Sequence, residues 1–230
     1  KYSSLKENEQ TLIKEMVPDI ELPKENDTSS DIKDEPLGYN PLFLGKDYEV
    51  PLPILSKEME KDTAKTKDGN YVLDYMHFSI VMKKSRGLAY FTAVNIDGRD
   101  EVKIKRTADN WKFDPRISRE YQYGEEVYVN NELDRGHLVR RTDPNWGKNA
   151  MKANEDTFHF TNSTPQHKNL NQKTWVELED YIFRNAVLNQ FKVSVFTGPV
   201  FREDDMIYRQ KYQIPAEFWL LLQLLLVFLS

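Results

Sequence analysis

The stretch DRGHLVRRTDPNWG, residues 134–147, holds the side chains best suited to acid–base chemistry. His137 follows a glycine, which lets the backbone turn or approach another group closely. An imidazole with a pKa of roughly 6.5 can accept a proton from water at neutral pH. Arg135, Arg140 and Arg141 supply fixed positive charge and forked donors that suit phosphate. Taken alone, the motif still favours a structural histidine, because four-residue motifs recur by chance.

A second cluster, FHFTNSTPQHKNLNQKTWVELEDYI at residues 158–182, is rich in side-chain oxygen donors. Hard cations such as Mg²⁺ take oxygen ligands and keep several waters, so one or two protein ligands suffice. Asn171 stands where a helix should begin, and it can be an ion ligand or simply the helix cap. Glu179 lies eight residues on, about 80° around the helix and about 12 Å along it. A water-bridged link from Glu179 to an ion at Asn171 is therefore favoured over direct ligation by both.

The elements that must position these residues begin with strands. HFSIVMKK (77–84) and LAYFTAVNID (88–97) predict two strands joined by KSRG in a hairpin. EVKIKR (101–106) alternates and predicts a third strand, and VSVFTGPVF (193–201) predicts a further strand with a Gly-Pro break after it. Strands first, then a helix and another strand, indicate an α+β fold with a mixed, largely antiparallel sheet as its core.

The strongest helical pattern is NQKTWVELEDYIFRNAVLNQ, residues 171–190. Trp175, Leu178, Ile182 and Ala186 fall on one helical face, and charged residues occupy much of the rest. This spacing predicts an amphipathic helix that packs on the sheet and presents Asn171 at its start.

Composition narrows the class of protein. The 230 residues contain no cysteine, which excludes disulfides and thiolate metal sites. The net charge of -5 is unevenly spread, because residues 1–70 hold 10 Lys/Arg against 16 Asp/Glu, a net of -6. The remainder is close to neutral, at a net of +1. An enzyme that turns over polyanions does not need a strongly basic face, since its product must also leave.

The two ends of the chain differ from its middle. Residues 1–37 are polar and predict a tail or linker, with a short helix around Leu5–Met16. Residues 38–230 are predicted to form the folded domain, beginning with an extended, proline-rich segment. The end, 218–230, is almost wholly apolar and favours a buried or partner-facing helix or strand. A truncated membrane anchor is disfavoured, because twelve helical residues span about 18 Å against the roughly 30 Å hydrocarbon core. A cloning or assembly artefact is the third option.

Taken together, three motifs resemble the DNA/RNA non-specific endonuclease family, the endonuclease G-like ββα-metal nucleases. The motifs are DRGH at 134–137, TNSTPQ at 161–166 and LNQKTWVELE at 170–179. The segments GYNPLFLG, VPLP, HFSIVM, LAYFTAVNIDG and NWKFDPRI resemble bacterial members. The resemblance covers most of the chain from about residue 38 to 219 and implies a ββα-metal finger that carries the active site.

The resemblance implies a role for each matched residue. His137 matches the general base, and Asn171 matches the direct protein ligand of Mg²⁺, for which Mn²⁺ is an alternative. Glu179 matches the acid that orders metal-bound water, Asn162 the asparagine that supports the site, and Arg135 the arginine near the phosphate. The implied activity is hydrolysis of DNA and RNA with little sequence specificity, leaving 5′-phosphate ends.

The remaining site residues are interpreted less directly. Arg106, before NWKFDP, is our candidate for the family's upstream arginine, although the spacing differs. Arg140, Arg141 and Gln166 are expected to bind substrate, and Asp134 to orient rather than ligate. DNA and RNA are the expected substrates, with a homodimer and a protein inhibitor as further partners and no stable membrane span. A secreted or periplasmic bacterial location is expected. The competing hypotheses are a nuclease restricted to DNA or to one structure, and a catalytically weak nucleic-acid-binding or toxin-like module.

Overall fold

The computed structural model describes residues 35–106, 108–168 and 176–224. Pro36–Leu225 form one compact unit. The helix expected near Leu5–Met16 and the residues Asn171 and Trp175 lie outside the described ranges.

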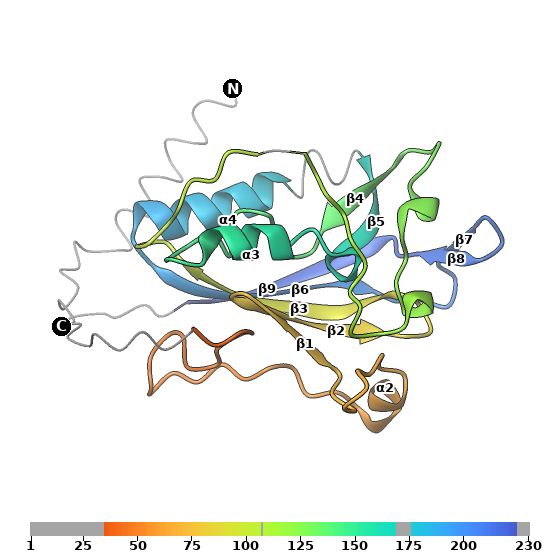
Figure 1. Cartoon of the computed structure of the whole chain (residues 1–230), viewed down its shortest axis with the longest axis horizontal. Coiled ribbons are helices and arrows are strands. Elements are labelled where there is room, and N and C mark those ends of the chain that lie inside the picture. The colour runs from red at the N-terminus through yellow and green to blue at the C-terminus, as the bar shows by residue number, and fades with distance from the viewer. Residues whose placement is uncertain (1–34, 107, 169–175, 225–230) are drawn as a thin grey trace. The chain divides into compact units, whose positions relative to one another are not determined.

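A five-stranded antiparallel sheet forms the centre of the fold, with the strand order β1-β2-β3-β6-β9 (Figure 1). Its strands are β1 (Val72–Tyr75), β2 (Phe78–Lys83), β3 (Leu88–Asp97), β6 (Lys192–Val200) and β9 (Glu217–Leu224). The predicted hairpin is confirmed, since β2 and β3 pair antiparallel across the KSRG turn. All ten residues of β3 are buried because both faces of the sheet are covered.

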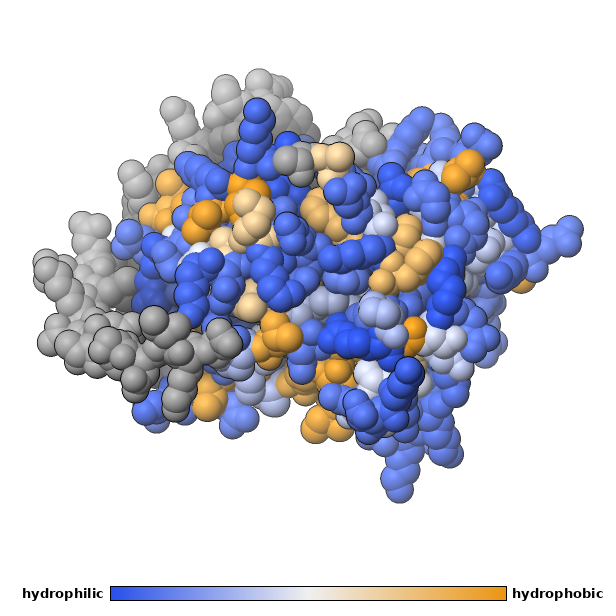
Figure 2. Space-filling model, in the orientation of Figure 1, coloured by the Kyte–Doolittle hydropathy of each residue, from blue (hydrophilic) through white to orange (hydrophobic). Residues whose placement is uncertain are grey.

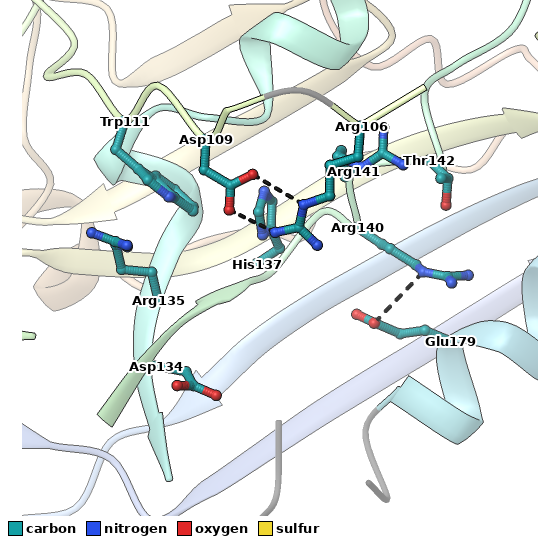
Figure 3. A pocket seen from close by; sticks show the side chains of 10 residues that line it. All are labelled: Arg106, Asp109, Trp111, Asp134, Arg135, His137, Arg140, Arg141, Thr142 and Glu179. Atoms are coloured by element: carbon teal, nitrogen blue, oxygen red, sulfur yellow. Dashed lines mark hydrogen bonds and ion pairs between the residues drawn. The ribbon is translucent and has the colours of Figure 1, made fainter. Parts of the chain in front are cut away.

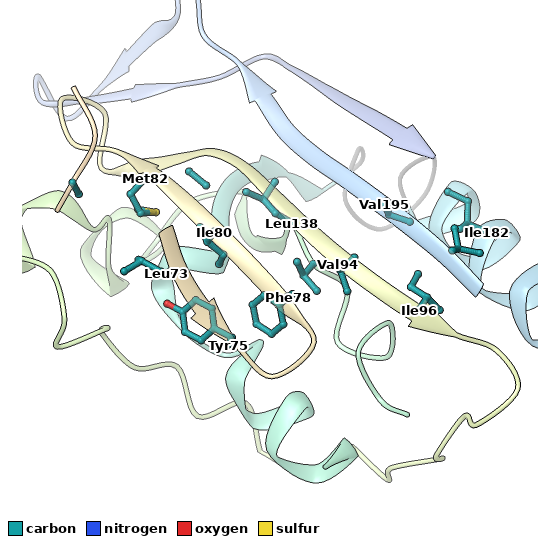
Figure 4. Packing of buried hydrophobic residues seen from close by; sticks show 14 of the residues in the cluster. Leu73, Tyr75, Phe78, Ile80, Met82, Val94, Ile96, Leu138, Ile182 and Val195 are labelled. Carbon is teal, nitrogen blue, oxygen red and sulfur yellow. The ribbon is translucent and has the colours of Figure 1, made fainter. Parts of the chain in front are cut away.

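Helices α3 (Ala150–Asp156) and α4 (Val176–Leu188) lie on one face of the sheet, and the segment 36–56 crosses the other (Figure 1). The main core fills the space between the sheet and the helices, and Phe78, Val94 and Ile182 are among its members (Figure 4). The crossing segment, which has no regular structure, is tied down where the Tyr39 amide donates to the Ser79 hydroxyl at 2.8 Å.

The buried face of α4 is rotated relative to the prediction. Ile182 and Ala186 are buried as expected, but Leu178 is 40% exposed. Phe183 packs against the core instead, so the inward stripe includes positions 179, 182, 183 and 186. Because both 178 and 179 are compatible with a helical stripe, only the packing decides between them, and it turns Glu179 inward.

Two strand predictions need correction. Residues 101–106 are not a strand: Glu101 makes one isolated bridge, and the side chain of Val102 is exposed, so the segment buries too little to join the sheet. The Gly198–Pro199 pair lies inside β6, not after it, and pairs with β9. A Cβ at Gly198 would lie 2.5 Å from the Tyr90 carbonyl oxygen, so glycine permits this close approach.

The ββα finger predicted from the motifs is present in the described residues. Strands β4 (Leu133–His137) and β5 (Ser163–His167) pair antiparallel, with His137 opposite Ser163, and α4 follows along the chain. The expected α+β class with a largely antiparallel sheet is therefore confirmed. The remaining short elements are α2 (Lys57–Lys61), η1 (Arg119–Tyr121), η2 (Glu125–Val127), η3 (Phe160–Asn162), β7 (Met206–Tyr208) and β8 (Tyr212–Ile214).

The described part of the apolar C-terminal run forms the edge strand β9, which is one of the expected alternatives. Leu221 remains 57% exposed on this edge. Among the described residues, no helix has the length and apolar character needed to cross a membrane. The face shown in Figure 2 is mostly hydrophilic, with hydrophobic residues scattered over it.

Candidate active site

A cavity of about 600 Å³ lies between the β4 end of the finger, the 106–111 loop and the start of α4 (Figure 3). Ten residues line it: Arg106, Asp109, Trp111, Asp134, Arg135, His137, Arg140, Arg141, Thr142 and Glu179. Four of these are arginines, and three are acids. The cavity thus combines a histidine with dense cationic charge, a composition that suits phosphate esters.

His137 is held by aromatic packing. Its ring centroid lies 4.7 Å from that of Trp111 and 5.2 Å from that of Phe158, the latter edge to face. The Nε2 atom is buried and has no hydrogen-bond partner among the described residues. Burial lowers the pKa of His137 to about 3; Asp109 opposes this shift, and nearby arginines add to it. The imidazole is therefore neutral at physiological pH, with a ring nitrogen free to accept a proton.

The glycine of the DRGH motif is explained by the neighbouring strand. A Cβ at Gly136 would lie 2.1 Å from Oε1 of Gln166, so that side chain occupies the space that any other residue would need. Gln166 is 1% exposed, and its amide has no hydrogen-bond partner among the described residues. Its contact with the backbone at Gly136 sets the position of β4 immediately before His137.

Asn162 fixes the backbone on the other side of His137. Its Oδ1 accepts from the Val139 amide at 2.8 Å, and its Nδ2 donates to the Val139 carbonyl at 2.9 Å. Nδ2 also donates to the Thr157 carbonyl at 3.0 Å. Because Asn162 is fully buried, these bonds satisfy groups that water does not reach. Asn162 is therefore a positioning residue that ties the residues just after β4 to those just before β5.

Two of the arginines that line the cavity, Arg106 and Arg135, form ion pairs with acidic side chains. Arg106 holds Asp109 through two bonds, Nε–Oδ1 at 3.0 Å and NH2–Oδ2 at 2.6 Å. Arg135 forms an ion pair with Glu125, and its guanidinium lies 5.9 Å from the centroid of Trp111. These contacts orient both guanidinium groups.

The other two arginines lie nearer to α4 and to the 104–106 segment. Arg140 bonds to Asp180, and its Nε lies 4.0 Å from Oε2 of Glu179 (Figure 3). Arg141 donates to the carbonyl of Ile104 at 3.3 Å. Burial, followed by repulsion from Arg106, lowers the pKa of Arg141. The positive charges thus crowd one another, and an added anion would relieve that repulsion.

The oxygen donors that line the cavity decide which kind of metal ion fits it. Within the described residues, no group of three or more histidine, cysteine or acidic side chains could hold a metal ion. The carboxylates of Asp134 and Glu179 line the cavity and offer oxygen donors only, which suits a hard ion such as Mg²⁺ that keeps much of its water. The donor chemistry therefore fits Mg²⁺ better than a soft metal.

Most of the predicted site residues lie in this one cavity. His137, Arg135, Glu179 and Arg106 line it, together with Arg140 and Arg141. Asn162, just before β5, and Gln166, within β5, are buried from solvent and do not line the cavity, and Asn171 lies outside the described residues.

Asp109 and Thr142 also line the cavity and were missed from the sequence. The spacing of Asp109, three residues after Arg106, was the only available signal. Trp111 lies in the cavity wall as well as against His137.

Comparisons with known proteins agree with the geometry. The model of the DNA/RNA non-specific endonuclease family matches residues 55–224. An uncharacterized protein of Sinorhizobium fredii is 41% identical over 197 residues, which is 79% of this chain and 29% of that protein. The mitochondrial endonuclease G of Homo sapiens is 38% identical over 90 residues, or 38% of this chain and 29% of the relative. The chain thus spans less than a third of the length of these relatives.

The fold has a counterpart among solved structures. A chain in the crystal structure of the EndoG/EndoGI complex superposes with a TM-score of 0.55 at 17% identity, covering 75% of this chain and 74% of that one. At this identity the likeness concerns the fold. The family model spans most of the described chain, so the chain belongs to the DNA/RNA non-specific endonuclease family.

Proposed function

We propose that the chain is a metal-dependent endonuclease that hydrolyses the phosphodiester bonds of DNA and RNA with little sequence specificity. One observation carries the proposal: a neutral imidazole, whose Nε2 has no hydrogen-bond partner among the described residues, lies in a cavity lined by four arginines. A general base must be unprotonated, and the arginines supply the charge that a phosphodiester requires. Contacts to phosphate carry no base code, so broad sequence tolerance is expected.

In this proposal His137 accepts a proton from a water molecule as the water oxygen attacks phosphorus in line. The bond from phosphorus to the 3′-oxygen breaks, and the departing oxygen takes a proton from solvent water, which leaves a 5′-phosphate and a 3′-hydroxyl. Arg135 and Arg106 stabilise the charge that accumulates on the non-bridging oxygens. Trp111 and Phe158 keep the imidazole in place and dry enough to remain neutral. The chain's residues thereby stabilise the charge on the phosphate, orient the imidazole and deprotonate the attacking water.

Asn171 and Glu179 are the residues that would hold Mg²⁺, Asn171 directly and Glu179 through water. When bound, the ion would stabilise negative charge in the transition state and on the departing oxygen. Asp180 lies next to Glu179 on α4, and its ion pair with Arg140 orients this end of the helix relative to the finger.

A protein inhibitor is a further proposed partner, because the related fold occurs in the EndoG/EndoGI complex.

The proposal is tested by incubating the protein with plasmid DNA and, separately, with RNA, each in the presence of Mg²⁺ or EDTA. We expect both substrates to be degraded with Mg²⁺ and both to survive with EDTA. Degradation of DNA alone would restrict the activity to DNA. Retarded but intact nucleic acid under all conditions would favour a binding module and refute the enzyme.

The lowered pKa of His137 predicts the pH dependence of catalysis. Because burial shifts this pKa from 6.5 to about 3, the imidazole is already neutral at weakly acidic pH. A plot of kcat/KM against pH should therefore show no loss of activity centred near pH 6.5, and its acid limb should fall below about pH 5. Measurement with a short DNA duplex at constant ionic strength checks this. An acid limb with a midpoint near 6.5 would contradict the buried, neutral base.

A further inference from the structure

The carboxylate of Asp109 lies inside the arginine-lined cavity, where the substrate phosphate must bind. It spans the fork of the Arg106 guanidinium through two bonds of 3.0 and 2.6 Å (Figure 3). Glu125 and Asp180, which pair with Arg135 and Arg140, do not line the cavity, whereas Glu179 lines it and lies 4.0 Å from Nε of Arg140. Asp109 faces the space left for substrate while both of its carboxylate oxygens bond to one guanidinium.

The charges around Asp109 match those that a phosphate would seek. The bonds from Arg106 are the largest influence that lowers the pKa of Asp109, and the charge of Arg135 acts in the same direction. Asp109 in turn acts electrostatically on Arg141. Arg106 thus holds the carboxylate directly, and the charges of Arg135 and Arg141 add to the attraction for an anion at this point.

We propose that Asp109 occupies the position of a substrate phosphate and competes with it for Arg106. The inference rests on the proposed nuclease function. A guanidinium group binds a carboxylate or a phosphate through the same pair of parallel hydrogen bonds, so one anion can replace the other without any change in the site's structure. Substrate binding then exchanges ligands on Arg106, and no covalent bond changes.

A phosphate can replace Asp109 on Arg106 because the Arg106–Asp109 ion pair is partly exposed to water. The Arg106 side chain is 63% exposed and that of Asp109 is 28% exposed. Exposed ion pairs contribute little to stability, so Asp109 can yield to an incoming phosphate. Its presence nevertheless lowers the affinity for polyanions, which limits product retention. Asp109 is thus an affinity-determining residue that acts through Arg106.

The test compares Asp109→Asn with Asp47→Asn, which changes the net charge equally at an exposed position outside the cavity. The probe is a short fluorescent DNA duplex in EDTA, titrated by anisotropy at several salt concentrations. Asp109→Asn should lower Kd roughly two- to fivefold at low salt. The slope of log Kd against log salt should steepen by roughly 0.9, the value for one additional phosphate contact. Adding Arg106→Gln to Asp109→Asn should cancel the gain. Asp109→Ser provides a second variant if the asparagine variant folds poorly.

The outcomes separate this inference from the function on which it rests. If the unmodified chain neither binds nor cleaves nucleic acid, the proposed function fails, and the inference fails with it. If the chain binds DNA but Asp109→Asn matches Asp47→Asn in both Kd and salt slope, only the inference is overturned. Weaker binding by Asp109→Asn would also overturn it, because Asp109 would then be needed to hold Arg106 for substrate. With Mg²⁺, a lower KM at similar kcat is the corresponding kinetic result.

Discussion

Replacing His137 with alanine should reduce kcat for DNA and RNA by roughly 10²- to 10⁴-fold, the range that a positioned general base contributes. The imidazole is neutral, its Nε2 is unpartnered among the described residues, and no other histidine lines the cavity. Arginine side chains remain protonated and cannot take over as bases. DNA affinity in EDTA should change little, because the arginines remain.

Chemical rescue separates a missing base from a damaged fold. Truncation of His137 leaves space beside Trp111 and Phe158, so free imidazole can enter and restore part of the rate. The control is His167→Ala, because the His167 side chain is 51% exposed and lies outside the cavity. That variant should retain near-normal kcat. A His137→Ala protein within tenfold of the normal rate would remove the base from the mechanism.

The sequence predicts the local features of this fold well. The strands at 78–83 and 88–97 follow from continuous apolar runs around a turn, a pattern that needs no knowledge of distant residues. The finger is predictable for another reason: its motifs demand particular side chains at fixed spacings. A glycine before His137 and a glutamine at 166 make sense only when one packs into the space left by the other.

Tertiary packing decides the features that the sequence does not predict. Residues 101–106 alternate like a strand but find no sheet edge, so the pattern alone misleads. The inward stripe of α4 omits Leu178 and gains Glu179 and Phe183, because Leu178 and Glu179 satisfy a helical period equally well. Asp109 shares the cavity with His137, 28 residues further along the chain, because tertiary folding brings its segment to the end of β4, where Trp111 packs on His137. Contacts of this kind leave no local signature.

Asn162→Ala should lower the free energy of unfolding by about 2–5 kcal/mol, because it leaves three buried backbone groups without partners. Those groups are the amide and carbonyl of Val139 and the carbonyl of Thr157. Urea unfolding followed by tryptophan fluorescence measures the change. The matched control is Asn189→Ala, because the exposed Asn189 amide donates one bond, to the Asn185 carbonyl at 2.9 Å. Its effect should stay within about 0.5 kcal/mol.

The same variant distinguishes a structural role from a chemical one. Asn162 is fully buried and lies outside the cavity, so its loss should reach catalysis only by displacing the strand that carries His137. Lower stability and lower kcat should therefore appear together. Asn162→Asp should be destabilised further as the pH rises, because it keeps the acceptor for Val139 but places an ionisable carboxyl in the interior. A normal unfolding midpoint with a large loss of kcat would instead make Asn162 a direct participant in the reaction.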